Sequence, residues 1–336
     1  MLSKDKHGRI ANPHFKSNQK KGRILMVEKQ LMTGVLPALI TPLDEKGNVK
    51  TELAAAIVAM YEKEQADGLY MLGWTGEGEH LDVARRKQWA EAVLEAAKGK
   101  LPIFVHVGYN ANLDDSVELA AHAEKHGAFA VSSVGIGPNA TLADNVAYFK
   151  RIAAAAPNVP FYIYWVAMGK TLTGGKPIAP DALLDALAEV PTFRGIKFTD
   201  NNFFILERFK KYRPDLNILT GADELAICSQ LMGADGNIGA LQAITCYHYK
   251  VMMQKFAQGD IAEARAMQYR ANEVSEFYAR EGIGSLPGIK VIIDRVFGIP
   301  AGNAAPNGPF GAKLPSEENI QALVEVFRKN ILIAGD

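Results

Sequence analysis

From Val35 onward, short apolar segments alternate with longer segments in which apolar residues recur every three to four positions. The short segments are rich in Val, Ile, Phe and Tyr, which is typical of buried strands, and the longer ones have the spacing of amphipathic helices. The apolar segments are 35–41, 68–73, 103–108, 128–133, 161–166, 194–199, 217–222 and 236–241. Helical spacing is clearest at 51–65, 83–97 and 116–126. Residues that can cap a helix precede such runs, at Thr51, Asp82, Asp114 and Asp181.

Strands separated by helices pair in parallel, because parallel neighbours need a crossover connection. The repeated strand–helix unit predicts an α/β fold, the (β/α)₈ or TIM barrel. A doubly wound sheet is the competing architecture, but it carries a glycine-rich phosphate-binding turn after its first strand, and "TPLDEKGNV" (41–49) has none. Beyond Tyr247 only helical patterns remain. We therefore expect the barrel to span 31–258 and a C-terminal helical region, 259–336, to pack on it.

Composition narrows the possible partners and the compartment. Lys plus Arg and Asp plus Glu balance at 37 each, which gives no indication of a nucleic-acid or anionic-membrane partner. The two cysteines, Cys228 and Cys246, fit a reduced, cytoplasmic compartment. No apolar run approaches the length of a membrane span. Residues 1–30 are polar and basic, and we expect them to be a disordered or loosely docked extension.

The strand "FRGIKFTDN" (193–201) contains a lysine, Lys197, among apolar residues. In a TIM barrel the chemistry lies at the carboxyl ends of the strands. Burial disfavours an ammonium ion, lowers the pKa of the lysine and frees an amine that attacks ketones to form a Schiff base. The alternative is a lysine that reaches solvent at the strand end. Tyr164, one unit earlier, either shuttles protons for such a lysine or only packs in the barrel interior.

Other strand ends carry weaker signals. In "GWTGEGEHL" (73–81), the Thr75 hydroxyl and nearby amides can hold a small carboxylate, or the segment is a simple βα turn. Asp223 and Glu224 can bind substrate hydroxyls, or merely favour a helix N-terminus. His106 is interpreted as a hydrogen-bonded core residue. The sequence has no nucleophile elbow, Walker A loop or zinc-type Cys/His spacing, so no metal and no cofactor are expected.

Several of these motifs occur together in one order along the chain. They are "GWTGE" (73–77), Tyr164, "GIKFT" (195–199), "GADE" (221–224) and "GADGNIG" (233–239). Over about residues 33–310 the chain resembles the N-acetylneuraminate lyase / dihydrodipicolinate synthase family of class I aldolases, and it is closer to the lyase branch. The resemblance implies a cofactor-free barrel enzyme that acts on a small 2-oxo acid and assembles as a homotetramer.

The resemblance also implies roles for individual residues. Lys197 would form an imine with pyruvate or another 2-oxo acid, and Tyr164 would shuttle protons. Thr75 and the Gly76 amide would hold the pyruvate carboxylate. The other positions implied to contact substrate are Trp74, Thr199, Gly221, Asp223, Glu224 and Ala240.

The sequence departs from the family pattern at defined positions. Trp74 stands where the family has Ser or Thr, and an indole N–H donates a hydrogen bond but neither accepts one nor passes a proton. Ala240 stands where sialic acid recognition uses a serine. Trp165 follows Tyr164, so we expect two tryptophans at the pocket rim and a narrow, apolar pocket. The segment "SSVGIGPN" (132–139) lacks the aromatic pair that the synthases lend to a neighbouring subunit.

These observations favour a 2-oxo acid lyase that cleaves a sialic-acid-like or keto-deoxy sugar acid to pyruvate and an aldehyde. One alternative is dihydrodipicolinate synthase, which condenses pyruvate with aspartate semialdehyde. The other is a barrel that binds a ligand without catalysis.

Overall fold

The computed structural model describes residues 31–108, 112–137, 139–166, 170–173, 176, 178–311 and 315–335. The extension predicted for residues 1–30 lies outside the described residues. The two cysteines are free, with Cys246 buried and Cys228 exposed. None of the helices in the described part of the chain combines the length and the apolar character that crossing a membrane requires.

Eight parallel strands form a closed barrel, as predicted. They are β1 (Gly34–Val35), β2 (Leu69–Met71), β3 (Ile103–His106), β4 (Ala130–Ser133), β5 (Phe161–Val166), β6 (Phe193–Thr199), β7 (Asn217–Thr220) and β8 (Gly236–Asn237). Consecutive strands pair from β2 to β8, and β8 pairs with β1. A bridge between Ala38 and Tyr70 closes the ring, with Tyr70 N donating to the Pro37 carbonyl at 3.0 Å.

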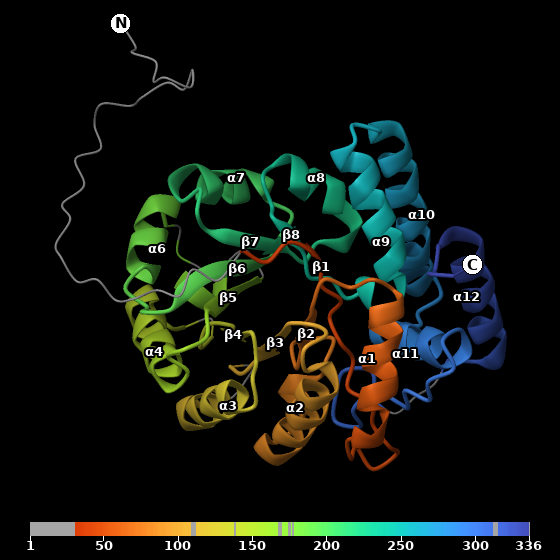
Figure 1. Ribbon diagram of the computed structural model, residues 1–336, viewed down its shortest axis with the longest axis horizontal. Helices are drawn as coiled ribbons and strands as arrows, with labels where there is room; N and C mark the ends of the chain where they lie inside the picture. Colours follow the sequence, from red (N-terminus) through yellow and green to blue (C-terminus); the bar gives the residue numbers. More distant parts are fainter. Residues whose placement is uncertain are drawn as a thin grey trace, which may run out of the picture. The chain divides into compact units, whose positions relative to one another are not determined.

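Helices surround the strands (Figure 1). They are α1 (Ala54–Lys63), α2 (Val83–Ala97), α3 (Leu113–Lys125), α4 (Leu142–Ala155), α5 (Lys170–Thr173), α6 (Pro180–Leu187), α7 (Phe203–Tyr212), α8 (Ala226–Leu231), α9 (Gln242–Ala257), α10 (Ile261–Arg280), α11 (Ser285–Arg295) and α12 (Glu317–Asn330). Short 3₁₀ turns precede three of them, at η1 (Thr51–Leu53), η2 (Gly78–His80) and η4 (Asp223–Leu225).

Of the four predicted helix caps, only Asp82 caps its helix, by accepting a hydrogen bond from Arg85 N at 2.8 Å. Asp114 lies inside the first turn of α3, and Asp181 lies in the first turn of α6, where acidic side chains stabilise the helix dipole without capping. Thr51 begins η1, which has no side-chain cap. The prediction was wrong at these three positions because a short side chain with a hydrogen-bond acceptor, such as Asp or Thr, is favourable both at the N-cap and in the first turn of the helix.

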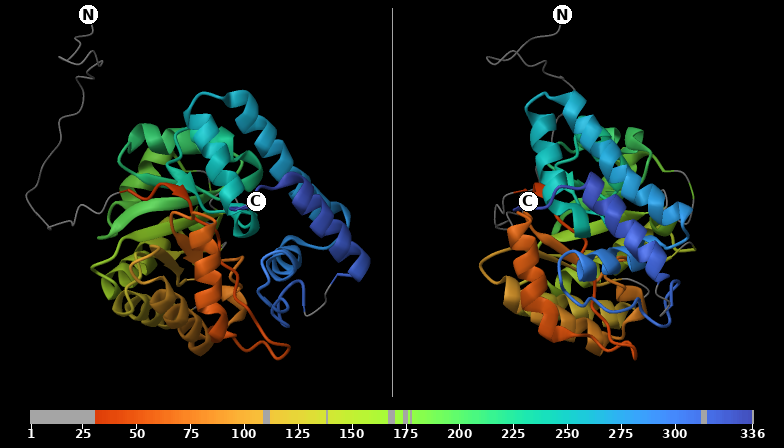
Figure 2. Two further views of the ribbon diagram at one scale, coloured as in Figure 1. Left: turned by 45° about the vertical axis from the view of Figure 1, so that its right-hand side comes forward. Right: turned by 90° about the vertical axis from the view of Figure 1, so that its right-hand side faces the viewer.

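The C-terminal helices pack on one another and on α9. The helix α10 lies beside both α9 and α12, and both views in Figure 2 show α10 and α12 together. The last segment is tied to α9, because Leu332 N donates to His248 Nδ1 at 3.2 Å. The domain division predicted after residue 258 falls in the connection between α9 and α10 and stays a prediction.

The two faces of each barrel strand have different surroundings. On β5, Tyr162 belongs to the cluster that fills the barrel interior, whereas Trp165 belongs to the core between strands and helices. The Trp165 ring stacks on Phe198 with 6.0 Å between centroids, and its Nε1 donates to Asp200 at 2.9 Å. The expectation that Trp165 stands at the pocket rim is therefore wrong, because successive strand residues point to opposite faces.

Candidate active site

Lys197 is buried inside the barrel, with only 5% of its surface exposed. Its Nζ lies 4.2 Å from the ring centroid of Tyr70 and 4.2 Å from that of Tyr164. Of the described residues, no carboxylate lies within 4.0 Å of this nitrogen. The faces of the two aromatic rings attract the Lys197 ammonium, but they stabilise its charge less than hydration by bulk water does. The amine is therefore held in a dry, aromatic setting at the centre of the barrel.

Burial lowers the pKa of Lys197 to about 7, and the nearby Asp223 carboxylate opposes this effect. Burial also raises the pKa of Asp223 to about 7, with a further contribution from Glu224. Near neutral pH a substantial fraction of Lys197 is then the free amine, which is the form that attacks a carbonyl carbon.

This pKa predicts a pH dependence of Schiff-base formation. The rate of imine formation with pyruvate at subsaturating concentration rises with pH and levels off above about pH 7, because deprotonation frees the attacking amine. Replacing Asp223 with Asn moves this rise to lower pH, since the carboxylate favours the ammonium form. Single-turnover borohydride trapping from pH 5 to 10 measures both curves. A rise centred near the ordinary lysine pKa would contradict the prediction.

Tyr164 lies directly across the β5–β6 pair from Lys197, as its partner in the strand register. Its ring makes an edge contact with the Tyr70 ring, with 6.4 Å between centroids. Burial raises the pKa of the Tyr164 phenol, and the nearby Thr199 side chain opposes this shift. The phenol is therefore protonated at neutral pH, so it is able both to donate and to accept a hydrogen bond beside the amine.

The loop after β2 is built around close backbone contacts. A Cβ atom on Gly76 would lie 2.5 Å from Leu72 N, which only glycine avoids. The Thr41 hydroxyl donates to the Gly76 carbonyl at 2.6 Å, and Thr75 is buried. The next residue, Glu77, has a left-handed backbone with φ of 54°. The loop therefore holds Thr75 and Gly76 in a defined position.

A buried ion pair anchors this loop to the C-terminal helices. Lys290 of α11 contacts a Glu77 oxygen at 2.5 Å, and both side chains are 2% exposed. The Lys290 ammonium also donates to the carbonyls of Thr41 at 2.9 Å and Asn303 at 2.6 Å. The second Glu77 oxygen accepts from Ala305 N. One carboxylate thus fixes the loop, α11 and the segment after it.

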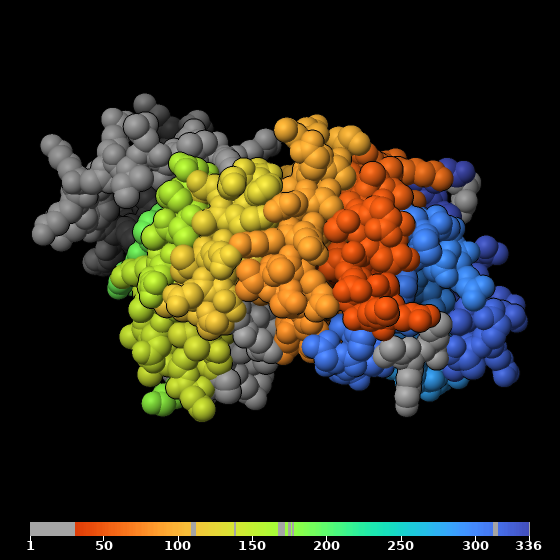
Figure 3. All heavy atoms as spheres, turned by 90° about the horizontal axis from the view of Figure 1, so that it is seen from below, coloured from red at the N-terminus to blue at the C-terminus, as the bar shows by residue number. Residues whose placement is uncertain are grey.

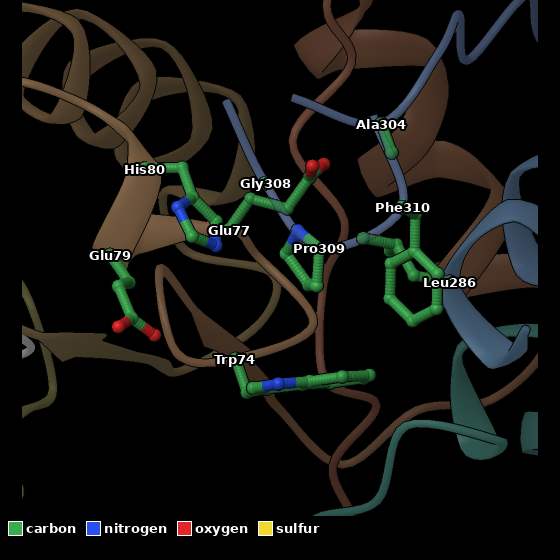
Figure 4. A pocket seen from close by; sticks show the side chains of 9 residues that line it. All are labelled: Trp74, Glu77, Glu79, His80, Leu286, Ala304, Gly308, Pro309 and Phe310. Atoms are coloured by element: carbon green, nitrogen blue, oxygen red, sulfur yellow. The ribbon is translucent and has the colours of Figure 1, made fainter. Parts of the chain in front are cut away.

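Trp74 packs against Phe310. Their rings meet edge to face with 6.0 Å between centroids, and Trp74 is 37% exposed. Figure 4 shows both rings lining a small pocket with Pro309 and Leu286. Trp74, at the position where the resemblance implies a hydroxyl, therefore contacts the 298–311 segment through Phe310.

Asp223 and Glu224 have different surroundings, although both follow β7. Asp223 is buried and accepts hydrogen bonds from Leu241 N at 2.9 Å and Gln242 Nε2 at 3.0 Å. Glu224 is exposed, and its Oε1 accepts from Ser275 of α10 at 3.1 Å. The two carboxylates are therefore not an equivalent pair.

Two glycines allow the ends of β6, β7 and β8 to approach one another. A Cβ on Gly221 would lie 2.0 Å from Thr199 Oγ1, and one on Gly239 would lie 1.6 Å from Asp223 Oδ1. Ala240, the last of the implied contact residues, is half-buried directly after Gly239. The structure thus gathers Thr199, Gly221 and Asp223 at neighbouring strand ends.

Comparison with known proteins agrees with this geometry. The sequence matches the dihydrodipicolinate synthetase family over residues 31–324. It is 32% identical to N-acetylneuraminate lyase of Gallus gallus over 286 residues, which cover 82% of this chain and 90% of that protein. The chain belongs to this family. It is also 30% identical to N-acetylneuraminate lyase of Salmonella typhi over 263 residues, covering 78% of this chain and 86% of that protein.

Solved structures of the family share the fold. The native N-acetylneuraminate lyase of Aliivibrio salmonicida superimposes with a TM-score of 0.81 at 27% identity, covering 90% of this chain and 99% of that one. The Proteus mirabilis lyase gives the same TM-score of 0.81 at 27% identity, covering 90% and 100%. The barrel and its C-terminal helices are therefore the family fold.

Tyr70 is a residue of the site that the sequence pattern did not identify, because it stood only within a predicted strand. The Tyr70 hydroxyl lies 2.8 Å from His106 Nδ1 and 3.0 Å from Ser132 Oγ, and Arg86 donates to the His106 carbonyl at 2.9 Å. Burial lowers the pKa of His106 well below its usual value, so the ring is neutral. The hydrogen-bonded core role predicted for His106 is confirmed. Leu69 and Met71 pack in the core between strands and helices, so the opposite orientation of successive strand residues places Tyr70 inside the barrel.

Proposed function

We propose that this family member is a pyruvate-dependent carbon–carbon lyase, a class I aldolase in which Lys197 forms the Schiff base. The observation that carries the proposal is the Lys197 amine, buried between the Tyr70 and Tyr164 rings with a pKa of about 7. Relatives named N-acetylneuraminate lyase, from both animals and bacteria, support the reaction class.

The proposed reaction uses the amine of Lys197, the phenol of Tyr164 and a site that binds the carboxylate of the substrate. The Lys197 amine attacks the C2 ketone of a 2-oxo acid, a molecule of water leaves, and the protonated imine withdraws electrons from the C3–C4 bond. Tyr164 gives its proton to the C2 hydroxyl that leaves as water, and the resulting phenolate takes the proton of the C4 hydroxyl as the C3–C4 bond breaks, so an aldehyde leaves and an enamine remains. Protonation at C3 and addition of water then release pyruvate and restore the free amine.

The substrate carboxylate is assigned to the Thr75 hydroxyl and the Gly76 amide, on the loop that Glu77 holds. The remainder of the substrate faces the strand ends and the adjacent loop. The residues proposed to contact it are Trp74, Thr199, Gly221, Asp223, Glu224 and Ala240. Fixed donors of this kind lower the entropic cost of orienting the substrate over Lys197.

The proposed substrate is a sialic-acid-like or shorter keto-deoxy sugar acid. A panel of such acids, with lactate dehydrogenase detecting released pyruvate, tests this directly, and pyruvate release from at least one member is expected. The synthase reaction is tested with pyruvate and aspartate semialdehyde. Only background turnover is expected there, because the Trp74 indole, packed on Phe310, supplies no hydroxyl to relay a proton. Turnover at ordinary enzyme rates in the synthase assay would contradict this choice.

The phenol of Tyr164 gives a prediction that separates binding from chemistry. Replacing Tyr164 with Phe lowers kcat for cleavage by about 10²–10⁴-fold, the usual contribution of a positioned proton-transfer group, while borohydride with pyruvate still labels Lys197. Tyr162→Phe is the matched control: Tyr162 also lines the barrel interior, but its hydroxyl donates to Asn217 at 2.7 Å. Equal losses in both variants would mean that packing, not the phenol, matters.

Assembly, location and cofactor use belong to the same proposal. We expect a homotetramer without a resident metal or cofactor, located in the cytoplasm. The free cysteines Cys228 and Cys246 support a reduced compartment. Light scattering coupled to size-exclusion chromatography measures the mass of the assembly. Dialysis against a chelator tests whether the enzyme needs a metal, and we expect full activity afterwards. If the barrel instead binds a ligand without catalysis, calorimetry would detect pyruvate binding, but borohydride would trap no covalent adduct.

A further inference from the structure

Away from the barrel mouth, two neighbouring helices bring three metal-type ligands together. The helices α2 and α3 lie side by side in the outer ring, in orange and yellow on the face seen in Figure 3. His122 lies in the last turn of α3 and His126, four positions later, caps the C-terminus of that helix, so both side chains lie on the same side of the helix end. Glu91 of α2 faces them.

The donor atoms of these residues converge on one point. His122 Nε2 lies 2.7 Å from Glu91 Oε1, and His126 Nε2 lies 3.8 Å from the same oxygen. One ligand atom from each of the three residues lies within 4.8 Å of the others. The two imidazole rings stack, with 4.4 Å between centroids and 28° between planes. The side chains of His122, His126 and Glu91 are 12%, 32% and 51% exposed, so an ion reaches them from solvent.

The separations between these ligand atoms are close to those of a metal site. Zinc binds imidazole nitrogen and carboxylate oxygen at about 2.0–2.2 Å, which separates ligand atoms by roughly 3.3 Å in a tetrahedral site. The separations between the nitrogens and the Glu91 oxygen lie on either side of that value, so small side-chain rotations are enough.

We propose that Glu91, His122 and His126 form a binding site for a divalent transition-metal ion, with water completing the coordination. Imidazole ligands select zinc, copper or nickel over magnesium and calcium, which prefer sites made only of oxygen atoms. The ammonium of Lys125 lies near Glu91 and would compete with a metal ion for its carboxylate. A separate ion pair, Lys87–Glu118, also joins α2 to α3. The site is distinct from Lys197 and does not depend on the proposed lyase chemistry.

The position of the site indicates what a bound ion does. The helix α3 ends at Lys125 and leads into the amino end of β4, so the site lies at the end of the barrel opposite the strand ends that carry the chemistry. An ion there cross-links α2 to α3, which stabilises the barrel rather than taking part in the reaction. We therefore expect zinc to raise the melting temperature without changing catalysis.

Isothermal titration of the full chain with zinc chloride tests the site. The wild type is expected to bind one ion here, and His122→Ala, His126→Ala and Glu91→Gln are each expected to weaken that binding at least tenfold. Melting in the presence of a chelator shows that the variants fold. Their lyase activity, measured beside the wild type, is expected to be unchanged.

The matched control replaces two histidines outside this cluster, His7 and His14, with Ala together. This double variant is expected to retain the zinc affinity of the wild type, and magnesium or calcium is expected to give no heat of binding at the site. Equal zinc affinity in the wild type and the three ligand variants would overturn the proposal. Loss of binding in the His7/His14 variant alone would overturn it as well, by placing the ion elsewhere.

Discussion

Replacing Lys197 with methionine lowers kcat for cleavage on the order of 10⁴-fold or more, because the step that makes the carbon–carbon bond labile is removed altogether. Methionine matches the length of the lysine stem and fills the space between the Tyr70 and Tyr164 rings. The loss therefore reports the missing amine rather than a collapsed cavity. Residual activity close to that of the wild type would contradict the assignment of the nucleophile.

The same substitution is expected to stabilise the fold at neutral pH, by up to a few kcal/mol in the free energy of unfolding. Burial lowers the pKa of Lys197 to about 7 from 10.5, so the folded state binds fewer protons than the unfolded state between these values. The cost of burying the ammonium is fully present below pH 7 and disappears as the pH rises toward 10.5.

The stabilisation by Lys197→Met should therefore shrink as the pH is raised from 7 to 10, which denaturant unfolding at several pH values measures. Lys211→Met is the control, because Lys211 is exposed on α7 and its loss is expected to change stability by less than about 0.5 kcal/mol. A Lys197→Met variant that is less stable than the wild type at pH 7 would show that the ammonium is not held at a cost.

Replacing Lys290 with methionine is expected to lower both the stability of the fold and the affinity for substrate. It leaves the Glu77 carboxylate buried without its cation, and breaking a buried pair in this way costs about 3–5 kcal/mol of unfolding free energy. The loop that carries Thr75 and Gly76 loses one of its anchors to α11, so KM for the 2-oxo acid rises more than kcat falls. Urea unfolding and steady-state kinetics measure the two effects.

An exposed ion pair provides the matched control for Lys290. Arg295, also on α11, contacts Glu317 at 3.1 Å with side chains 48% and 58% exposed, and Arg295→Met is expected to cost less than about 1 kcal/mol. The double variant Glu77→Gln/Lys290→Met is expected to recover part of the loss, because no buried charge remains unpaired. Equal costs for Lys290→Met and Arg295→Met would mean that the buried pair does not anchor the loop.

Much of the barrel and the centre of the site follow from local sequence patterns. The alternation of apolar and helical segments identified the strands, and one lysine in an apolar strand identified Lys197. The strand register then places Tyr164 beside it. Successive residues of a strand point to opposite faces, so Trp165, directly after Tyr164, points away from the pocket. The prediction for the pocket rim was wrong because it considered only that Trp165 is next to Tyr164 in the sequence.

Other features depend on contacts that no local pattern contains. Glu77 and Lys290 are 213 residues apart, and neither has a sequence context that indicates a buried partner. Asp223 and Glu224 look equivalent in sequence, yet one is buried beside Leu241 while the other bonds to Ser275 of α10. The contact of Trp74 with Phe310 likewise depends on how the segment after α11 returns to the barrel.

The most direct test of the central claim is covalent trapping at Lys197. The chain is treated with borohydride in the presence of pyruvate, then digested and mapped by mass spectrometry, with borohydride alone as the control. We expect one reduced pyruvyl group per chain, on the peptide that contains Lys197, and none in Lys197→Met. A chain that gains no mass, or that carries the group on a different lysine, would contradict it.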